Sequence, residues 1–281
     1  MSSALPPDAG AATAAGEEEA AARLLAPREV CLVRAPNPGP LTLTGTNTWV
    51  VGRDPAWVID PGPLIEEHLE RLGAEIDARG GLGGIVLTHD HHDHSEAVGE
   101  LRVRHPAPLA AGRGEQADVL LTDGARVGPF EAIATPGHAI DHFALLREGV
   151  CFSGDAVLGS GSVFISPHAG ALGGYLRALE RLRAREEIEL ICPGHGPLVS
   201  DPHAKLAEYV AHRLDRERRL RAALAEGRRS VEDLLDAAWP DVPAQLRPAA
   251  AVTLAAHLDK LEEEGALPDG VERPDFGDVE W

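Results

Sequence analysis

One stretch of the sequence decides the fold: Thr88-His89-Asp90-His91-His92-Asp93-His94. It follows the apolar run Gly84-Ile85-Val86-Leu87 and precedes Ser95-Glu96-Ala97, which is a plausible start for a helix. This order predicts a buried strand that delivers metal ligands at its carboxyl end. In an extended or turning loop, residues two apart point the same way, so His89 and His91 can bind one ion. Asp93 and His94, at the next bend, can bind a second ion.

Three further potential ligands follow predicted strands, at turns that contain glycine. They are His138 in Thr135-Pro136-Gly137-His138, Asp155 in Phe152-Ser153-Gly154-Asp155, and His195 in Cys192-Pro193-Gly194-His195. Glycine lets the backbone turn at little steric cost, although each of these residues alone is also typical of an ordinary turn. Jointly the four loops supply seven ligands: His89, His91 and His138 for one ion, Asp93, His94 and His195 for the other, and Asp155 as a bridge.

The first two hundred residues alternate strand-rich and helix-bearing segments, which is typical of sheets covered by helices. Strands are expected at 30–34, 46–52, 56–60, 84–87, around Leu109, and at 130–135, 142–146, 150–153 and 189–192. Helices are expected at 64–79, 95–104 and 171–187. The polar cluster therefore follows the fourth strand of this series.

Composition narrows the class of protein. With 26 basic and 45 acidic residues among 281, the net charge is -19, which repels polyanions unless basic residues are segregated. The three cysteines lie far apart and show no CxxC spacing, which favours a reducing compartment. Residues 1–26 are rich in Ala and Gly and lack the pattern of a signal peptide, so we expect a disordered tail, a cytoplasmic protein and no membrane span.

The histidine and aspartate motifs resemble those of the metallo-β-lactamase superfamily. Gly45-Thr46-Asn47-Thr48-Trp49, Val58-Ile59-Asp60-Pro61-Gly62-Pro63, the stretch from Thr135 to His142, and Tyr209-Val210-Ala211-His212-Arg213 resemble the β-lactamase-like protein 2 group. The resemblance covers roughly residues 30–267. It implies an α/β fold, a four-layer αββα sandwich with a small C-terminal winged-helix-like helical domain. His92 departs from the group, which often has a small residue or proline there, and it is out of ligand register.

Composition and the resemblance together predict the following domains: a disordered tail at 1–26, a metallo-β-lactamase-like catalytic domain at 27–205, a connecting helix at 206–229, a winged-helix-like domain at 230–270, and an acidic tail at 271–281. Two apolar faces fit the fourth of these segments. Val231, Leu234, Leu235 and Ala238 form one of them, and Leu254, Leu258 and Leu261 form the other.

The resemblance also implies two zinc ions and a hydrolase in which a metal-bridging hydroxide attacks the substrate. Asp93 would hold its metal and orient the nucleophile or shuttle its proton. Asp60 and His142 are candidates for positions behind the ligands or against substrate, and Asp60 is equally typical of a turn-capping carboxylate. Ser166, His168, His203 and His212 are further candidates to border the cleft.

Two substrate classes remain open. One is an ester, thioester or lactone-type carbonyl, and the alternative is single-stranded RNA, cleaved by an endoribonuclease. Residues 213–229 carry seven arginines against three acidic residues, net +4, and a basic helix beside the cleft could hold phosphates. A solvated helix with intrahelical ion pairs fits the same segment.

A DNA-binding regulator is the least favoured function. Its recognition helix would run from Pro248 to Gly265 and would carry four acidic residues against Lys260 alone, which is unfavourable in a phosphate-lined groove. We therefore expect a small-molecule substrate or single-stranded RNA as partner, no duplex DNA and no membrane. The C-terminal domain is expected to shape the cleft or to mediate a homodimer.

Overall fold

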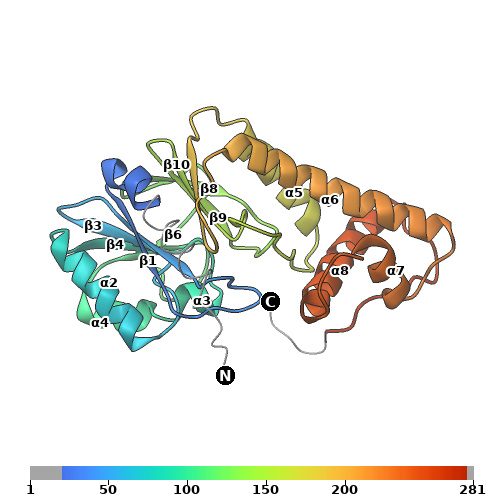
Figure 1. Ribbon diagram of the computed structural model, residues 1–281, viewed down its shortest axis with the longest axis horizontal. Helices are drawn as coiled ribbons and strands as arrows, with labels where there is room; N and C mark the ends of the chain where they lie inside the picture. The colour runs from blue at the N-terminus through green and yellow to red at the C-terminus, as the bar shows by residue number, and fades with distance from the viewer. Residues whose placement is uncertain (1–20, 277–281) are drawn as a thin grey trace, which may run out of the picture.

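β-Branched and aromatic residues build the first sheet of the protein, whose computed structural model describes residues 21–276 (Figure 1). Its six strands are β1 (Val30–Arg34), β2 (Asn47–Val51), β3 (Ala56–Ile59), β4 (Leu82–Val86), β5 (Leu109–Ala111) and β6 (Val119–Leu120). They lie in the order β1-β2-β3-β4-β5-β6, antiparallel as far as β3 and parallel from β3 to β6. The crossover from β3 to β4 passes through α2 (Glu66–Ala78), because parallel neighbours cannot be joined by a tight turn.

The second sheet brings the carboxyl ends of three ligand-bearing strands to the same edge. Its strands are β7 (Arg126–Val127), β8 (Phe130–Ala134), β9 (Phe143–Arg147), β10 (Val150–Gly154) and β11 (Leu190–Pro193), in the order β11-β10-β9-β8-β7. β10 and β11 are parallel, and the other neighbours are antiparallel. Hence β8, β10 and β11 run in the same direction, and their carboxyl ends meet at the same edge of the sheet.

Three apolar clusters separate four layers and confirm the predicted αββα sandwich. The first lies between α2, α4 (Val98–Arg104) and the first sheet, the second between the two sheets, and the third between the second sheet and α5 (Ala171–Arg183). Representative members are Leu72, Leu101 and Ile85 in the first, Trp49, Phe130 and Phe152 in the second, and Ile133, Leu172 and Leu179 in the third.

A long helix connects the sandwich to the C-terminal helices. Helix α6 (Pro202–Ala225) begins at Pro202, and the side chain of Asp201 accepts a hydrogen bond from the Ala204 amide at 3.0 Å. It runs from the sandwich to α7 (Val231–Ala238), η2 (Ala244–Leu246) and α8 (Arg247–Glu263) (Figure 1). Six of the predicted apolar residues are buried together with α6 in a fourth cluster: Leu234, Leu235, Ala238, Leu254, Leu258 and Leu261.

The chain differs from the sequence expectations near both ends. Residues 21–25 are helical and precede η1 (Ala26–Arg28), and Leu25 is buried between the sheets, so the expected tail does not extend to residue 26. Arg273 pairs with Asp259 and Glu262 of α8, which ties down part of the expected acidic tail. The remainder of both tails, residues 1–20 and 277–281, lies outside the described residues.

The expected helix at 95–104 also differs. It begins at Val98 and is preceded by the short α3 (His92–Ser95), so part of the metal-ligand stretch is helical. None of the helices within residues 21–276 combines the length and the apolar character that crossing a bilayer requires.

His257 is an uncharged histidine in the core of the C-terminal helices. Its side chain is 0% exposed, its ring centroid lies 5.5 Å from that of Trp239, and neither ring nitrogen has a hydrogen-bond partner. Burial holds the pKa of His257 well below 6.5, and the charges of Arg213 and Lys260 lower it further. The unfolded chain therefore binds a proton below pH ~6.5 that the folded chain does not bind.

We expect the free energy of unfolding to fall as the pH drops below about 6.5, and the variant His257→Leu to lose part of this dependence. By pH 5.5 the free energy of unfolding of the wild type should have fallen by roughly 1 kcal/mol more than that of His257→Leu. Urea denaturation at several pH values measures it. The exposed His203→Gln serves as the control. A slope in His257→Leu equal to that of the wild type would show that this histidine does not contribute.

Candidate metal centre

The predicted ligands are delivered by the end of β4 and by the short helix that follows it. His89 is fully buried, His91 is extended, and Asp93 and His94 lie on α3 (His92–Ser95). The expectation of a continuous loop is therefore wrong for Asp93 and His94, although both side chains still turn toward the same centre. The exposed His92 belongs to none of the ligand groups among the described residues.

Close packing at the second sheet's edge requires glycine before two of the ligands. Gly154 has a φ of 47°, and an added Cβ there would lie 2.4 Å from Thr88 Oγ1. At Gly194 an added Cβ would lie 2.3 Å from Asp155 Oδ1 and 2.8 Å from His94 Cε1. Real Cβ atoms do not approach so closely, so a larger residue at Gly154 would displace Thr88, and one at Gly194 would displace the ligands Asp155 and His94.

All seven predicted ligands converge on one centre. Three groups have their donor atoms within 4.8 Å of one another: His89, His91 and His138; Asp93, His94 and His195; and His89, His94 and Asp155. His91 Nδ1 lies 3.0 Å from both His89 Nε2 and His138 Nε2, and His94 Nε2 lies 3.3 Å from His195 Nε2. Tetrahedral zinc with nitrogens at ~2.0–2.1 Å separates its ligand atoms by about 3.3 Å, so this spacing fits zinc.

Asp155 has the position expected of a bridge. Its Oδ1 lies 3.6 Å from His94 Nε2, and its Oδ2 lies 3.6 Å from His138 Nε2 and 3.4 Å from His195 Nε2. Oδ1 is buried without a hydrogen-bond partner, which is costly for a carboxylate oxygen unless a cation satisfies it. Imidazole and carboxylate donors together suit zinc and related divalent metals.

A single carboxylate orients ligands of both groups. Asp60 Oδ1 accepts from the Thr88 amide at 2.8 Å, and its Oδ2 accepts from Thr88 Oγ1 at 2.7 Å and from His94 Nδ1 at 2.9 Å. Because the Thr88 hydroxyl donates to Asp60, its oxygen accepts from His89 Nδ1, which lies 3.0 Å away. This network leaves Nε2 of both His89 and His94 unprotonated and available to a metal.

His142 is buried and supports the loop that carries Asp155. The Asp155 amide donates to its Nε2 at 3.0 Å, so its Nδ1 donates to Thr135 Oγ1 at 2.7 Å. With both nitrogens occupied and the side chain buried, His142 fixes the loop that carries Asp155. Of the two positions expected for His142, behind the ligands or against substrate, these contacts favour the one behind the ligands.

The charges of the centre favour a cation. Burial lowers the pKa of His138 to about 3, so this imidazole is neutral. Burial would also lower the pKa of His195, but Asp155 and Asp93 outweigh it and raise that pKa to about 10. For Asp93, burial is outweighed by His94 and His195, which lower its pKa to about 2. The carboxylates thus create a negative potential that a metal ion would balance.

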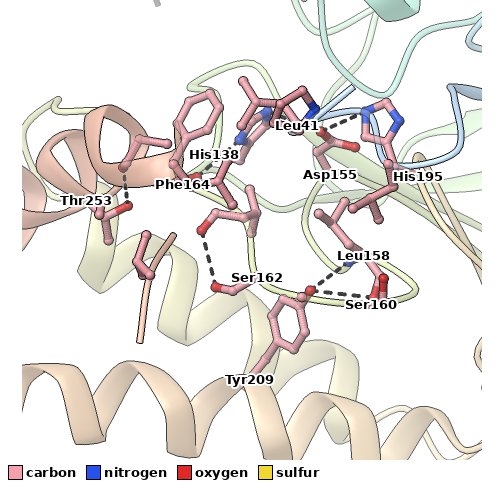
Figure 2. Close-up of a pocket in the computed structure, with 18 of the residues that line it drawn as sticks. Leu41, His138, Asp155, Leu158, Ser160, Ser162, Phe164, His195, Tyr209 and Thr253 are labelled. Carbon is pink, nitrogen blue, oxygen red and sulfur yellow. Dashed lines mark hydrogen bonds and ion pairs between the residues drawn. The ribbon is translucent and has the colours of Figure 1, made fainter. Parts of the chain in front are cut away.

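A cavity of about 790 Å³ opens from this centre toward the C-terminal helices (Figure 2). Its wall is built from five parts of the chain: Leu41 and Leu43, the ligand loops, Leu158 to Phe164, one side of α6, and residues from Trp239 to Thr253. Phe164 packs on His138 with ring centroids 4.5 Å apart, and the Phe164 carbonyl lies 3.2 Å from His138 Nδ1. The C-terminal helices therefore form part of the wall of the cavity.

Most of the arginines of the basic segment 213–229 are occupied by protein carboxylates, which agrees with the ion-paired alternative. Asp215 pairs with Arg218 and Arg219, Glu217 with Arg221, Glu226 with Arg228, and Asp241 with Arg216. The helix also ends at Ala225, so the segment is not a single basic helix. Of the side chains proposed to border the cleft, His212 lines the cavity.

Sequence reasoning missed two parts of the site. Thr88 links Asp60 to His89, because its hydroxyl donates to the Asp60 carboxylate and accepts from the His89 ring. Its place directly before His89 was the signal that could have revealed it. Phe164 packs on a ligand but lies in a loop whose sequence, Ser162-Val163-Phe164, carries no recognisable pattern.

The comparisons with known proteins agree with this fold. The family model of the metallo-β-lactamase superfamily matches residues 41–120, and that of the β-lactamase-associated winged helix domain matches residues 230–267. A β-lactamase-like protein 2 homolog of Drosophila melanogaster is 31% identical over 261 residues, which cover 82% of this chain and 87% of the relative. A metallo-β-lactamase family protein from Thermus thermophilus has the same fold, with a TM-score of 0.70 at 24% identity over 85% of this chain and 94% of its own.

The four-layer sandwich that carries the histidine-aspartate centre is therefore a metallo-β-lactamase fold. The chain belongs to the metallo-β-lactamase superfamily, most of whose members are hydrolases, and to its family of β-lactamase-like protein 2 homologs with a C-terminal winged helix domain. An atrochrysone carboxyl ACP thioesterase of Aspergillus chevalieri is also similar, with 36% identity over 71% of this chain and 67% of the relative.

If Asp60 sets the protonation of two ligand histidines, Asp60→Asn should weaken metal binding about 10- to 100-fold. The amide nitrogen at Oδ2 would face the donors of Thr88 and His94, so the ligand tautomers would no longer be fixed. Competition with a chromophoric chelator measures zinc affinity. Asp123→Asn, which removes an exposed carboxylate paired with Arg181, is the control. Wild-type affinity in a folded Asp60→Asn protein would contradict the assigned role.

Proposed function

We propose that the protein is a dinuclear zinc hydrolase that cleaves an acyl thioester or a related ester or lactone. The observation that carries this proposal is the cavity, which leads from the metal centre between largely apolar walls. Such walls suit an acyl group, whereas a strand of RNA needs a groove lined with uncompensated cations. The thioesterase name of the Aspergillus chevalieri relative supports the same reaction class.

The ligand residues would hold the metal ions that activate water and polarise the carbonyl. When bound, two zinc ions would supply an activated water and would stabilise negative charge on the carbonyl oxygen. His89, His91 and His138 would hold one ion, and Asp93, His94 and His195 the other, with Asp155 between them. Hydrolysis forms a C–O bond from water and breaks the C–S bond, and a proton from that water passes to the leaving thiol.

Asp93 would orient the attacking water. It is the most exposed carboxylate of the centre, its side chain being 29% exposed, and it lines the cavity. Its Oδ2 lies 3.1 Å from His195 Nε2 and 3.5 Å from Thr46 Oγ1, which fix its direction. An ionised carboxylate accepts hydrogen bonds only, so it can hold a water by one of its protons. Phe164 and Leu158 line the cavity and limit the access of other water.

Single-stranded RNA remains the alternative substrate. Its main support was the basic segment 213–229, and five of the seven arginines there are paired with carboxylates. We further propose a cytoplasmic protein that does not bind duplex DNA.

Asp93→Ala should lower the turnover of acyl thioesters by about 100-fold or more, because the water loses its orienting group. The assay compares zinc-loaded wild type and variant on a panel of acyl thioesters and lactones and, in parallel, on a labelled single-stranded RNA. Asp118→Ala, which removes an exposed carboxylate away from the cavity, is the matched control. RNA cleavage that disappears in Asp93→Ala, without thioester turnover by the wild type, would identify a nuclease and overturn the proposal.

A further inference from the structure

The cavity wall contains a buried arginine that no carboxylate of the described part of the chain balances. Arg213 of α6 lines the cavity and is 2% exposed. Its Nη2 donates to the Val163 carbonyl, its guanidinium carbon lies 5.4 Å from the ring centroid of Tyr175, and its Nε has no hydrogen-bond partner. Within residues 21–276, no carboxylate forms an ion pair with it. A buried charge without a counter-ion is unfavourable, so this position is maintained at a cost in stability.

The neighbouring Arg216 shows how the chain treats a cation that has only a structural role. Its two terminal nitrogens lie 2.6 and 2.7 Å from the oxygens of Asp241, and one of them also donates to the Ala238 carbonyl. Both arginines line the same cavity, but only Arg216 is neutralised. The difference indicates that the counter-ion of Arg213 comes from outside residues 21–276.

The charges around Arg213 favour a ligand group that carries a single negative charge. Burial and the two arginines lower the pKa of His212 to about 4, so it is neutral near pH 7. Glu208 pairs with Lys205 at 3.1 Å, and at the other side of the cavity Asp90 pairs with Arg113 at 2.9 Å. One uncompensated charge matches a carboxylate better than a phosphate, which carries about -1.5 to -2 at neutral pH. A guanidinium also matches a carboxylate in its planar geometry.

An apolar surface lies between the metal centre and Arg213. The Val163 carbonyl accepts a hydrogen bond from Arg213. The next residue, Phe164, packs on the ligand His138 (Figure 2). Side chains from the C-terminal helices complete this wall: Trp239, Val242, Leu246, Ala249 and Ala250. A hydrocarbon chain suits such a surface, whereas the amide-rich arm of a carrier thiol would lose hydrogen bonds to water there.

We propose that Arg213 is an anion subsite, and that the substrate is an acyl thioester whose acyl chain ends in a carboxylate. This inference rests on the proposed function, and it names the substrate class of the same site. The reacting carbonyl lies at the metal centre, the hydrocarbon chain lies along Val163 and Phe164, and the terminal carboxylate accepts hydrogen bonds from Arg213. The thiol arm leaves through the open side of the cavity.

The test compares two thioesters of N-acetylcysteamine with equal chain length, hexanoyl and 5-carboxypentanoyl. We expect wild-type kcat/KM to be about 10- to 100-fold higher for the carboxylated substrate, the range of a charge-assisted hydrogen bond. Arg213→Gln should remove this preference, mainly by raising the KM for the carboxylated substrate. Arg213→Lys should restore part of the preference. Arg219→Gln removes an exposed arginine of the same helix that pairs with Asp215, and it should behave as wild type.

The outcomes separate this inference from the proposed function. If wild type hydrolyses both thioesters without preference, the anion subsite is wrong and carbonyl hydrolysis stands. If it hydrolyses neither, the proposed function fails. The wild-type comparison remains decisive even if Arg213→Gln does not fold. A second pair, hexanoyl pantetheine and hexanoyl phosphopantetheine, distinguishes the source of the anion, because a preference for the phosphorylated arm that depends on Arg213 would overturn the assignment to the acyl chain.

Discussion

The geometry of the metal centre depends on the hydrogen bonds that the Asp60 carboxylate accepts. Asp60 follows β3 (Ala56–Ile59) with a left-handed φ of 50°, a conformation that aspartate tolerates better than most residues. From there one carboxylate receives the Thr88 amide, the Thr88 hydroxyl and the ring of His94, so β3 and β4 are joined at their carboxyl ends. Since His89 is held through Thr88, both ligand groups inherit their orientation from this buried contact.

The gathering of three predicted ligands follows from a rule of topology. The strands β8, β10 and β11 run in the same direction and expose their carboxyl ends at the same edge of the second sheet, so the residues directly after them come together. Sheets covered by helices could be expected from the order of strands and helices, whereas the four-layer sandwich was expected from the resemblance to the superfamily. The short helix at Asp93 and His94 could not be expected, because four residues are too few for a periodic pattern to identify.

What the sequence could not reveal is which charges meet across distant segments. The seven arginines of 213–229 suggest a basic surface when counted along the chain, yet Arg216 is neutralised by Asp241 and Arg221 by Glu217 and Glu264. The pairs depend on how α6 packs against α8 and against the loop before it. The exceptional position of Arg213 emerges only from this comparison, because the absence of a paired carboxylate among residues 21–276 is a property of the packing and not of its motif.

The sandwich and the C-terminal part of the chain contribute different residues to the site. The sandwich supplies the ligands and the groups that orient them, whereas α6 and the C-terminal helices supply the far wall of the cavity. None of the seven ligands comes from beyond His195, so changes in Trp239, Leu246 or Ala250 can alter the shape of the wall without touching the metal centre. A family with this arrangement can keep one hydrolytic centre while its substrates change, because the two functions are carried by separate residues.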